Sequence, residues 1–499
     1  MIRHRLLLIL LGGIVAMGVA AQSQSFDEFR RQQQQQYRQY KSAKQKEYDA
    51  YRKQLNEQYA QKMSGKWDSF KPQPAIEPVK EEEVKPVVLD EPKPLDEPKP
   101  IEKPKPIEIE TVVVQVPKPA PAPAPIAPVE PLPQQSKKEE VVDFYGTVIP
   151  IDFPKQEKFV LSGIQEQDLA AGWKQLADET YDILIHSLLT AREKYQLCDW
   201  GFLQLVQRAT EQHYGSGNKA VLAQGYLMTQ AGYKVRLATN RAAGVLYLLI
   251  NCQYTVFNKP YYTIDGQRFI GAGNVSGTIE ICPALFEKEQ PLSLQIAQEQ
   301  KLTEQLSDER VLKSKKGLSA TVQVNTNNIA FYNDYPSACL NNDATTRWAA
   351  YANTPMDKHV QESLYPALHK SIEGLSEKEA VAQLLNWVQT AFTYKLDNEV
   401  WGGDRAFFAV ETLYYPYSDC EDRAILFSRL VRDILGMEVV LLYYPGHLAT
   451  AVYFKEEVNG DYLQYNNRKF VVCDPTYMNA GIGRTMPGMD NQKAKVIAL

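Results

Sequence analysis

The spacing of hydrophobic positions changes several times along the chain, and each change predicts a different kind of segment. Residues 6–21 are almost entirely apolar and end in the small residues Ala20 and Ala21. This run is shorter than a membrane-spanning helix, so it predicts a secretory signal peptide over 1–21 that is cleaved after Ala21. An uncleaved membrane anchor is the alternative. The mature protein is therefore expected to be exported, to a bacterial periplasm.

Aromatic residues recur at a regular spacing through the polar segment 22–70. Eleven residues separate each member of the series Phe26, Tyr37, Tyr48, Tyr59 and Phe70. Eleven residues make three helical turns, so these side chains would share one stripe of a helix. Such a stripe is stable only when another surface covers it. The segment predicts either a self-associating coiled coil or docking helix, or a marginal polar helix that is partly disordered.

Residues 71–140 are dominated by Pro, Lys, Glu and Val, with Asp-Glu-Pro-Lys-Pro at both 90–94 and 96–100. This composition cannot build a hydrophobic core. It predicts an extended, semi-stiff linker that rises about 3.1 Å per residue and could span on the order of 200 Å. Residues 22–140 are therefore expected to be dispensable for any chemistry.

From about residue 141 the apolar spacing becomes that of a globular α+β protein. Helical spacing comes first, β-rich patterns dominate 271–345, and helices and then strands follow over 346–499. The predicted helices are Leu169–Leu189, Phe202–His213, Val360–Glu373 and Glu377–Thr393. The predicted strands are Val245–Tyr254, Tyr261–Phe269, Ser319–Val324, Ile329–Tyr332, Val439–Tyr444, Ala449–Phe454 and Lys469–Cys473.

Charge and cysteine content narrow the function classes. A net charge of -5 argues against a nucleic-acid partner. The six cysteines (198, 252, 282, 339, 420 and 473) form no CxxC pair, so no zinc site and no cofactor are predicted. If Cys420 stays a free nucleophile, at most two disulfides can form among the other five in an exported protein.

Cys420 has the setting of a nucleophile. The run from 425 to 435 has helical apolar spacing and ends at Gly436, so Cys420 should lie in the first turn of a helix. The macrodipole and the free backbone N–H groups there favour an anion, and the pKa of the thiol is expected to fall.

A base and its orienting partner follow in the sequence. His447 is the only histidine after Cys420, and it opens a predicted strand. Asp474 ends the next strand, so adjacent antiparallel strands would place the imidazole beside the carboxylate. Cys420, His447 and Asp474 are therefore the predicted catalytic triad. The alternative is a buried core thiol and an ordinary strand histidine.

These motifs carry a resemblance. The sequence Asp-Cys-Glu-Asp-Arg-Ala at 419–424, Gly-His at 446–447 and Asp-Pro-Thr at 474–476 resembles the transglutaminase-like superfamily over about 150 residues. The resemblance implies a papain-like α+β domain at 346–499, with helices packed on an antiparallel sheet. It implies that Cys420 attacks an amide or isopeptide carbonyl, with its own backbone N–H in the oxyanion hole. Trp387 and Trp401 are candidates for the second donor.

Residues 141–270 look like a degenerate second copy of this domain. Positions 220, 222, 232, 235 and 237 match positions 424, 426, 436, 439 and 441 at a constant separation of 204 residues. In this alignment Ser216 replaces Cys420 and Ala243 replaces His447. Asp265 keeps the position of Asp474 at a separation of 209. Without a base the copy should be inactive, unless His213 reaches Ser216. Chance similarity between two helix–strand units is the alternative.

The sequence thus favours an exported cysteine peptidase or amidase that acts on protein or cell-wall peptide amides. Transfer to an amine is the competing outcome, because water and amine share one acyl-enzyme. The rival classes are a non-catalytic peptide-binding or scaffold protein and an assembly protein that self-associates through 22–70.

Overall fold

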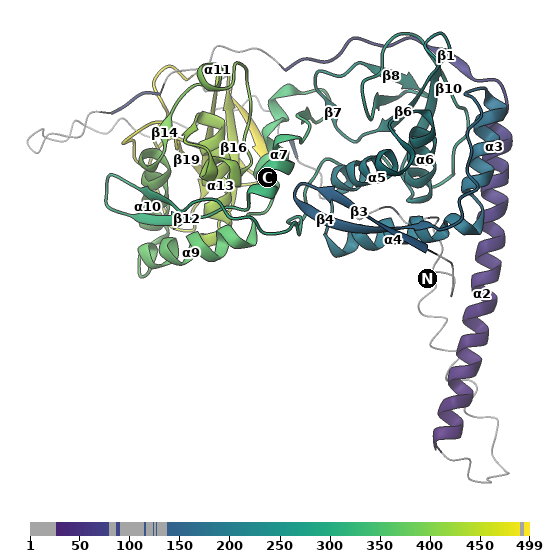
Figure 1. The fold of residues 1–499 in the computed structure, drawn as a ribbon. Coiled ribbons are helices and arrows are strands. Elements are labelled where there is room, and N and C mark those ends of the chain that lie inside the picture. The colour runs from purple at the N-terminus through teal and green to yellow at the C-terminus, as the bar shows by residue number, and fades with distance from the viewer. Residues whose placement is uncertain are drawn as a thin grey trace, which may run out of the picture. The chain divides into compact units, whose positions relative to one another are not determined.

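The computed structural model describes residues 26–78, 86–89, 114–115, 123, 126, 137–489 and 494–499 (Figure 1). The signal-peptide prediction and most of the predicted linker lie outside these residues. Helices and strands are mixed along the chain, so the α+β class is confirmed. Within the described part of the chain, no helix is long and apolar enough to cross a membrane.

The chain forms two units, residues 1–55 and 56–499. Helix α2 (Phe26–Met63) passes from the first into the second. In the first unit Tyr40 and Tyr51 are exposed, and the rings of Tyr48 and Tyr51 lie 6.4 Å apart.

The second unit contains two six-stranded sheets. The first has the order β1-β10-β5-β6-β9-β8 and is antiparallel throughout. Helices α5 and α6 pack together, and α6 also packs on β5 and β6 (Figure 1). The helices are α3 (Glu166–Leu176), α4 (Asp182–Lys194), α5 (Asp199–Tyr214) and α6 (Asn218–Gln230). The strands are β1 (Asp68–Phe70), β5 (Val235–Asn240), β6 (Val245–Asn251), β8 (Tyr261–Ile264), β9 (Gln267–Gly271) and β10 (Ile279–Ile281).

The second sheet has the order β2-β20-β16-β17-β19-β18. Helix α13 packs against α10 and against β16 and β17 (Figure 1). The helices are α10 (Glu377–Ala391) and α13 (Cys420–Leu435). The strands are β2 (Val114–Gln115), β16 (Val439–Tyr444), β17 (His447–Tyr453), β18 (Tyr462–Tyr465), β19 (Arg468–Cys473) and β20 (Lys495–Ala498).

The two sheets share one topology. In each, a helix leads into a hairpin, a second hairpin adds strands on one side, and a later strand returns to the other side. An edge strand from the N-terminal segment completes each sheet, β1 in one and β2 in the other. This common order is what two copies of one domain would show. The main difference lies between the paired helices, where three residues join α5 to α6 and 28 residues join α10 to α13.

Comparison of the strand pairing in the two sheets corrects two residue assignments in the predicted degenerate copy, those of Ala243 and Asp265. Ala243 lies in the turn between β5 and β6, and Val245 opens β6 as His447 opens β17. Asp265 lies in the β8–β9 turn with φ 49°, as Asn466 does in the β18–β19 turn with φ 50°. Asp265 is therefore a turn residue at the opposite end of the strand from the predicted carboxylate.

The remaining elements connect the sheets. The prediction of a strand at Ile329–Tyr332 is wrong, because Asn325 caps a helix there and its side chain accepts from the backbone of Asn327 at 3.1 Å. The helices are α7 (Thr326–Asn333), α8 (Trp348–Asn353), α9 (Lys358–Ile372), α11 (Asp397–Val400) and α12 (Ala409–Tyr414). The strands are β3 (Lys137–Phe144), β4 (Thr147–Pro154), β7 (Thr255–Val256), β11 (Arg310–Lys313), β12 (Ser319–Val322), β13 (Ala338–Cys339), β14 (Thr393–Tyr394) and β15 (Tyr417–Ser418).

The last turns of α2 contribute to the core of the second unit. Tyr59 near the end of α2 is 3% exposed, and its ring stacks on Trp173 at 4.2 Å and on Phe286 at 4.8 Å. The described parts of the Pro-rich segment also pair with the two sheets, as Gln73 does with Tyr261. These parts are attached to the globular unit and do not form a free spacer.

Replacing Tyr59 with Ala is expected to destabilise the protein by about 3–5 kcal/mol, because it empties a buried aromatic site. The matched control is Tyr51→Ala, which removes the same side chain from the same helix where it is 53% exposed. Urea unfolding of the full chain measures both. Equal effects of the two changes would contradict this account of the core.

His213 holds the β3–β4 hairpin and does not contact Ser216. Its Nδ1 lies 2.9 Å from Glu140 Oε1 and its Nε2 lies 2.8 Å from Glu157 Oε1, while its ring stacks on Phe153 at 4.0 Å. Both ring nitrogens are therefore occupied by carboxylates, and Ser216 is exposed. The described residues hold no second triad in this copy.

The two carboxylates give His213 a role in the pH dependence of stability. Burial lowers the pKa of His213, but hydrogen bonds and charges from Glu157 and Glu140 outweigh it and raise the pKa above 6.5. This contribution is fully present below about pH 6.5 and is lost as pH rises through the higher folded-state pKa. Thermal unfolding between pH 6 and 9 should therefore show a decline that His213→Gln reduces. An unchanged profile in His213→Gln would rule this contribution out.

Candidate active site

Cys420 is the first residue of α13, where the prediction placed it. Asp419 is the N-cap, and the side chain of Asp422 accepts a hydrogen bond from the Asp419 N–H at 3.2 Å. Phe407 N–H donates to the other oxygen of Asp422 at 2.9 Å, which ties the helix start to the preceding loop. Cys420 is 3% exposed. The helix therefore begins at a fixed point, and the thiol is held there.

His447 and Asp474 form a buried pair on neighbouring strands. His447 is the first residue of β17, which pairs with β19, and Asp474 follows β19 directly. His447 Nε2 lies 2.8 Å from Asp474 Oδ2, and their side chains are 0% and 2% exposed. The second oxygen of Asp474 accepts from the N–H groups of Thr476 at 2.8 Å and Tyr477 at 3.2 Å. The carboxylate is thus fixed at both oxygens.

This geometry leaves one imidazole nitrogen available. The carboxylate accepts the Nε2 proton, so the Nδ1 of a neutral His447 carries a lone pair. Nδ1 is buried and has no hydrogen-bond partner among the described residues. An oriented ring with one unoccupied basic nitrogen is what a general base requires.

Cys420 and His447 line the same cavity, which has a volume of about 580 Å³. Glu421, Asp404, Arg347 and Trp348 also line it. Asn258, Glu77 and Pro78 contribute to the wall from distant parts of the sequence. The structure therefore brings two predicted triad members to one space and places the third behind the histidine.

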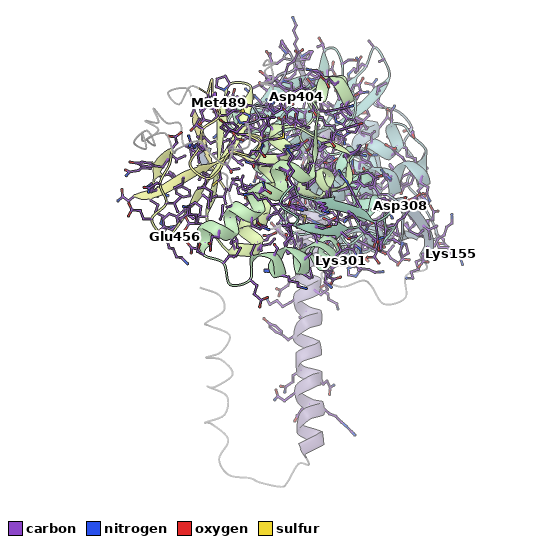
Figure 2. All side chains as sticks on the ribbon, turned by 90° about the vertical axis from the view of Figure 1, so that its left-hand side faces the viewer. Lys155, Lys301, Asp308, Asp404, Glu456 and Met489 are labelled. Carbon is purple, nitrogen blue, oxygen red and sulfur yellow. The ribbon has the colours of Figure 1, made fainter. Side chains whose placement is uncertain are left out.

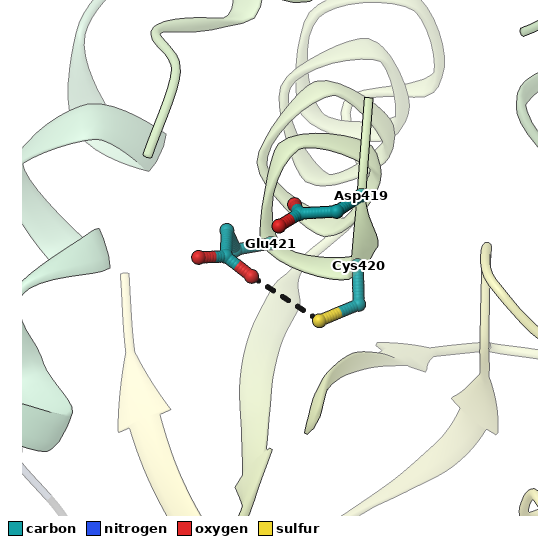
Figure 3. Close-up of side chains that lie close together, drawn as sticks. All are labelled: Asp419, Cys420 and Glu421. Carbon is teal, nitrogen blue, oxygen red and sulfur yellow. Dashed lines mark hydrogen bonds between the residues drawn. The ribbon is translucent and has the colours of Figure 1, made fainter. Parts of the chain in front are cut away.

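Glu421 contacts the thiol directly, which the sequence did not reveal. Cys420 Sγ donates to Glu421 Oε2 at 3.2 Å (Figure 3). Burial raises the pKa of the Cys420 thiol well above its usual value, and the charges of Glu421 and Asp419 raise it further, while the Leu448 N–H lowers it. The expected fall in the thiol pKa is therefore wrong, because burial and two nearby carboxylates outweigh the helix macrodipole. In this state Cys420 is a neutral thiol.

Glu421 has a second carboxylate, Asp404, and a cation, Arg347, as neighbours in the cavity wall. Arg347 Nη2 lies 2.7 Å from Asp404 Oδ2, and Asp404 is labelled in Figure 2. Burial raises the pKa of Asp404 to about 6, and its hydrogen bond with Glu421 adds to the rise. Ligand atoms of Asp397, Asp404 and Glu421 lie within 4.8 Å of one another, as the oxygen ligands of a hard cation do.

Two buried residues hold the loops that carry the triad. Gln389 Nε2 lies within 2.9–3.1 Å of three carbonyl oxygens, those of Asp474, Tyr477 and Ala480. Arg423 is fully buried and donates to the carbonyl oxygens of Gln389 at 3.2 Å and Phe392 at 2.9 Å. Neither role could be read from sequence, because both depend on backbone atoms of distant segments.

The two tryptophans proposed as oxyanion donors lie elsewhere. Trp387 Nε1 donates to the carbonyl of Leu312 at 3.2 Å in the core. Trp401 is 36% exposed and does not line the cavity. Trp348 does line it, is 3% exposed, and its Nε1 has no hydrogen-bond partner within the described ranges. Of the three tryptophans, Trp348 is therefore the one that lines the cavity and has an indole N–H without a partner among the described residues.

No protein-family model matches the chain, and neither a curated protein nor a solved structure matches it.

Replacing Glu421 with Gln removes a negative charge beside the thiol and keeps a side-chain oxygen that can accept its hydrogen bond. The pKa of Cys420 should fall, so alkylation by iodoacetamide at pH 7 should become faster, because a thiol pKa lower by one gives about ten times more thiolate at this pH. Mass spectrometry of Cys420 across pH 6–10 gives the midpoint of the rate profile. Glu362→Gln, on an exposed helix face, is the matched control. A midpoint that stays at its wild-type value in Glu421→Gln would refute this account of the thiol.

Proposed function

We propose that this protein is a thiol-dependent hydrolase of the transglutaminase-like type that cleaves or transfers an amide or isopeptide acyl group. One observation carries the proposal. The buried His447–Asp474 pair leaves Nδ1 of His447 without a partner, and His447 and Cys420 line one cavity. A purely structural histidine at 0% side-chain exposure would be expected to satisfy both of its ring nitrogens.

The resting protonation states define the chemistry. Because Cys420 is a neutral thiol, His447 acts as a general base during attack, and the site does not start from a thiolate–imidazolium pair. Nδ1 takes the thiol proton as Sγ bonds to the carbonyl carbon, and the C=O electron pair moves onto oxygen. The backbone N–H of Cys420 and Nε1–H of Trp348 are the proposed donors to this oxyanion.

Collapse of the tetrahedral species completes the first half. The C–N bond breaks, and the leaving amine takes the proton from His447, which gives a thioester on Cys420. Water or a second amine then attacks the thioester with His447 again as base, and the thiol is restored. Asp474 orients the ring throughout.

The fold class and the location belong to the same proposal. The motifs around Cys420, His447 and Asp474 are the basis for proposing a papain-like or transglutaminase-like domain over 346–499. The same order of hairpins in the two sheets supports a degenerate copy over 141–270. The apolar run at 6–21 supports export, to a bacterial periplasm, where protein and cell-wall peptide amides are available substrates.

A non-catalytic peptide-binding protein is the second candidate. The observation that favours it is the hydrogen bond from Cys420 to Glu421, which directs the thiol proton away from His447. In this alternative the cavity binds a peptide without covalent chemistry.

Labelling kinetics separate the two candidates. His447→Ala should slow modification of Cys420 by a thiol-directed electrophile at pH 7 by about 100-fold or more, the usual contribution of a positioned base. Asp474→Asn should slow it strongly as well, through loss of the correct tautomer. His369→Ala removes an exposed imidazole and serves as control. Equal Cys420 rates in wild type and His447→Ala would leave only the binding role.

A further inference from the structure

The loop that leads from β7 into the first sheet contributes to the wall of the candidate active-site cavity. Asn258 follows β7 in this sheet's half of the chain and lines the cavity with Cys420 and His447. Glu77 and Pro78 line it as well. A segment before the first domain and a loop of the inert copy therefore meet at the candidate active site.

Residues 71–78 are seated on this copy by backbone hydrogen bonds. Gln73 N–H donates to the Tyr261 carbonyl at 2.7 Å, and Tyr261 N–H donates back to Gln73 at 3.3 Å. Asn258 N–H donates to the Ile76 carbonyl at 2.9 Å. These are the contacts of an extended chain added to a strand edge, since Tyr261 opens the edge strand β8.

The proline content of residues 71–78 limits how many hydrogen bonds they can form with β8. Pro72, Pro74 and Pro78 have no backbone N–H to donate, so the segment can form only part of a strand ladder. No residue of 71–78 is buried. A chain held by three backbone hydrogen bonds with little apolar burial can be displaced by a better-paired one.

A second attachment lies beyond the triad carboxylate. Met478 N–H donates to the Val87 carbonyl at 3.1 Å, and Leu89 N–H donates to the Met478 carbonyl at 3.1 Å. Met478 is four residues after Asp474. The N-terminal segment thus contacts the wall of the cavity at 77–78 and the loop behind His447 at 87–89.

We propose that the edge formed by Tyr261 and Asn258 is a docking track on which an extended polypeptide substrate reaches Cys420, and that residues 71–78 occupy this track in the resting protein. The track gives the inert copy a function that needs no triad. Recognition is by main-chain hydrogen bonds, so the substrate class is an unfolded or extended segment of polypeptide. A folded, compact amide donor would not fit. The inference rests on the proposed function only in taking Cys420 as the reactive group.

The test compares two reagents on Cys420 in the full chain. Iodoacetamide is small and needs no track, whereas an alanine-rich hexapeptide with a C-terminal chloromethyl ketone needs one. Gln73→Pro removes the N–H that Tyr261 accepts, and Gln73→Ala is the matched control that keeps it. The peptide reagent should modify Gln73→Pro several-fold faster than wild type, as loss of one backbone hydrogen bond predicts. Iodoacetamide should react equally with all three proteins.

An added peptide of residues 71–78 provides a test that does not depend on folding of a variant. It should slow the hexapeptide reagent on Gln73→Pro and on wild type, and a scrambled peptide should not. Equal peptide-reagent rates in Gln73→Pro and Gln73→Ala, with no effect of the added peptide, would overturn the docking track. Failure of the proposed function is distinguishable, because it appears as an unchanged iodoacetamide rate in His447→Ala.

Discussion

The buried pair between His447 and Asp474 is the constraint on which the candidate active site depends. An ionised carboxylate at 2% exposure is costly unless its oxygens are paired, and here the imidazole and two backbone N–H groups pair them. The pair also fixes the register of β17 against β19, since a one-residue slip would turn His447 to the other face. The orientation of the His447 ring, with Nδ1 on the side away from Asp474, follows from that register.

The two sheets have the same order of hairpins, and the residues at their corresponding positions differ in chemistry. In the second half of the chain the 28 residues between α10 and α13 bring ligand atoms of Asp397 and Asp404 within 4.8 Å of that of Glu421. In the first sheet three residues join the corresponding helices, and Val245 stands where His447 stands. A strand-and-helix frame of this kind can persist after its site is lost, because packing and hydrogen bonding do not depend on the triad.

The sequence predicted what depends on local pattern. Cys420 at a helix start, His447 at a strand start and Asp474 at a strand end follow from apolar spacing and from the order of the segments. The assignment of Ala243 was wrong because four residues join β5 to β6 but two join β16 to β17, and a fixed offset cannot follow this change. The assignment of Asp265 was wrong because the separation of 209 set a residue of the β8–β9 turn against the end of a strand. The thiol pKa was also wrong, because burial and the orientation of Glu421 are properties of the packed structure.

The contacts of the N-terminal segment with the two sheets could not be predicted from the sequence, because they also depend on the folded structure. Proline-rich composition excludes a core, yet it does not exclude docking of isolated residues such as Gln73 onto an edge strand built from a distant part of the chain.

The central claim is that Cys420 forms a thioester with help from His447, and trapping that intermediate tests it most directly. The full chain is mixed with an activated acyl ester, quenched in acid and digested, and the acylated residue is located by mass spectrometry. The account predicts one acyl group on Cys420 that neutral hydroxylamine removes, with much less of it in His447→Ala. Acylation of another residue, or none on Cys420 in the folded wild-type protein, would contradict it.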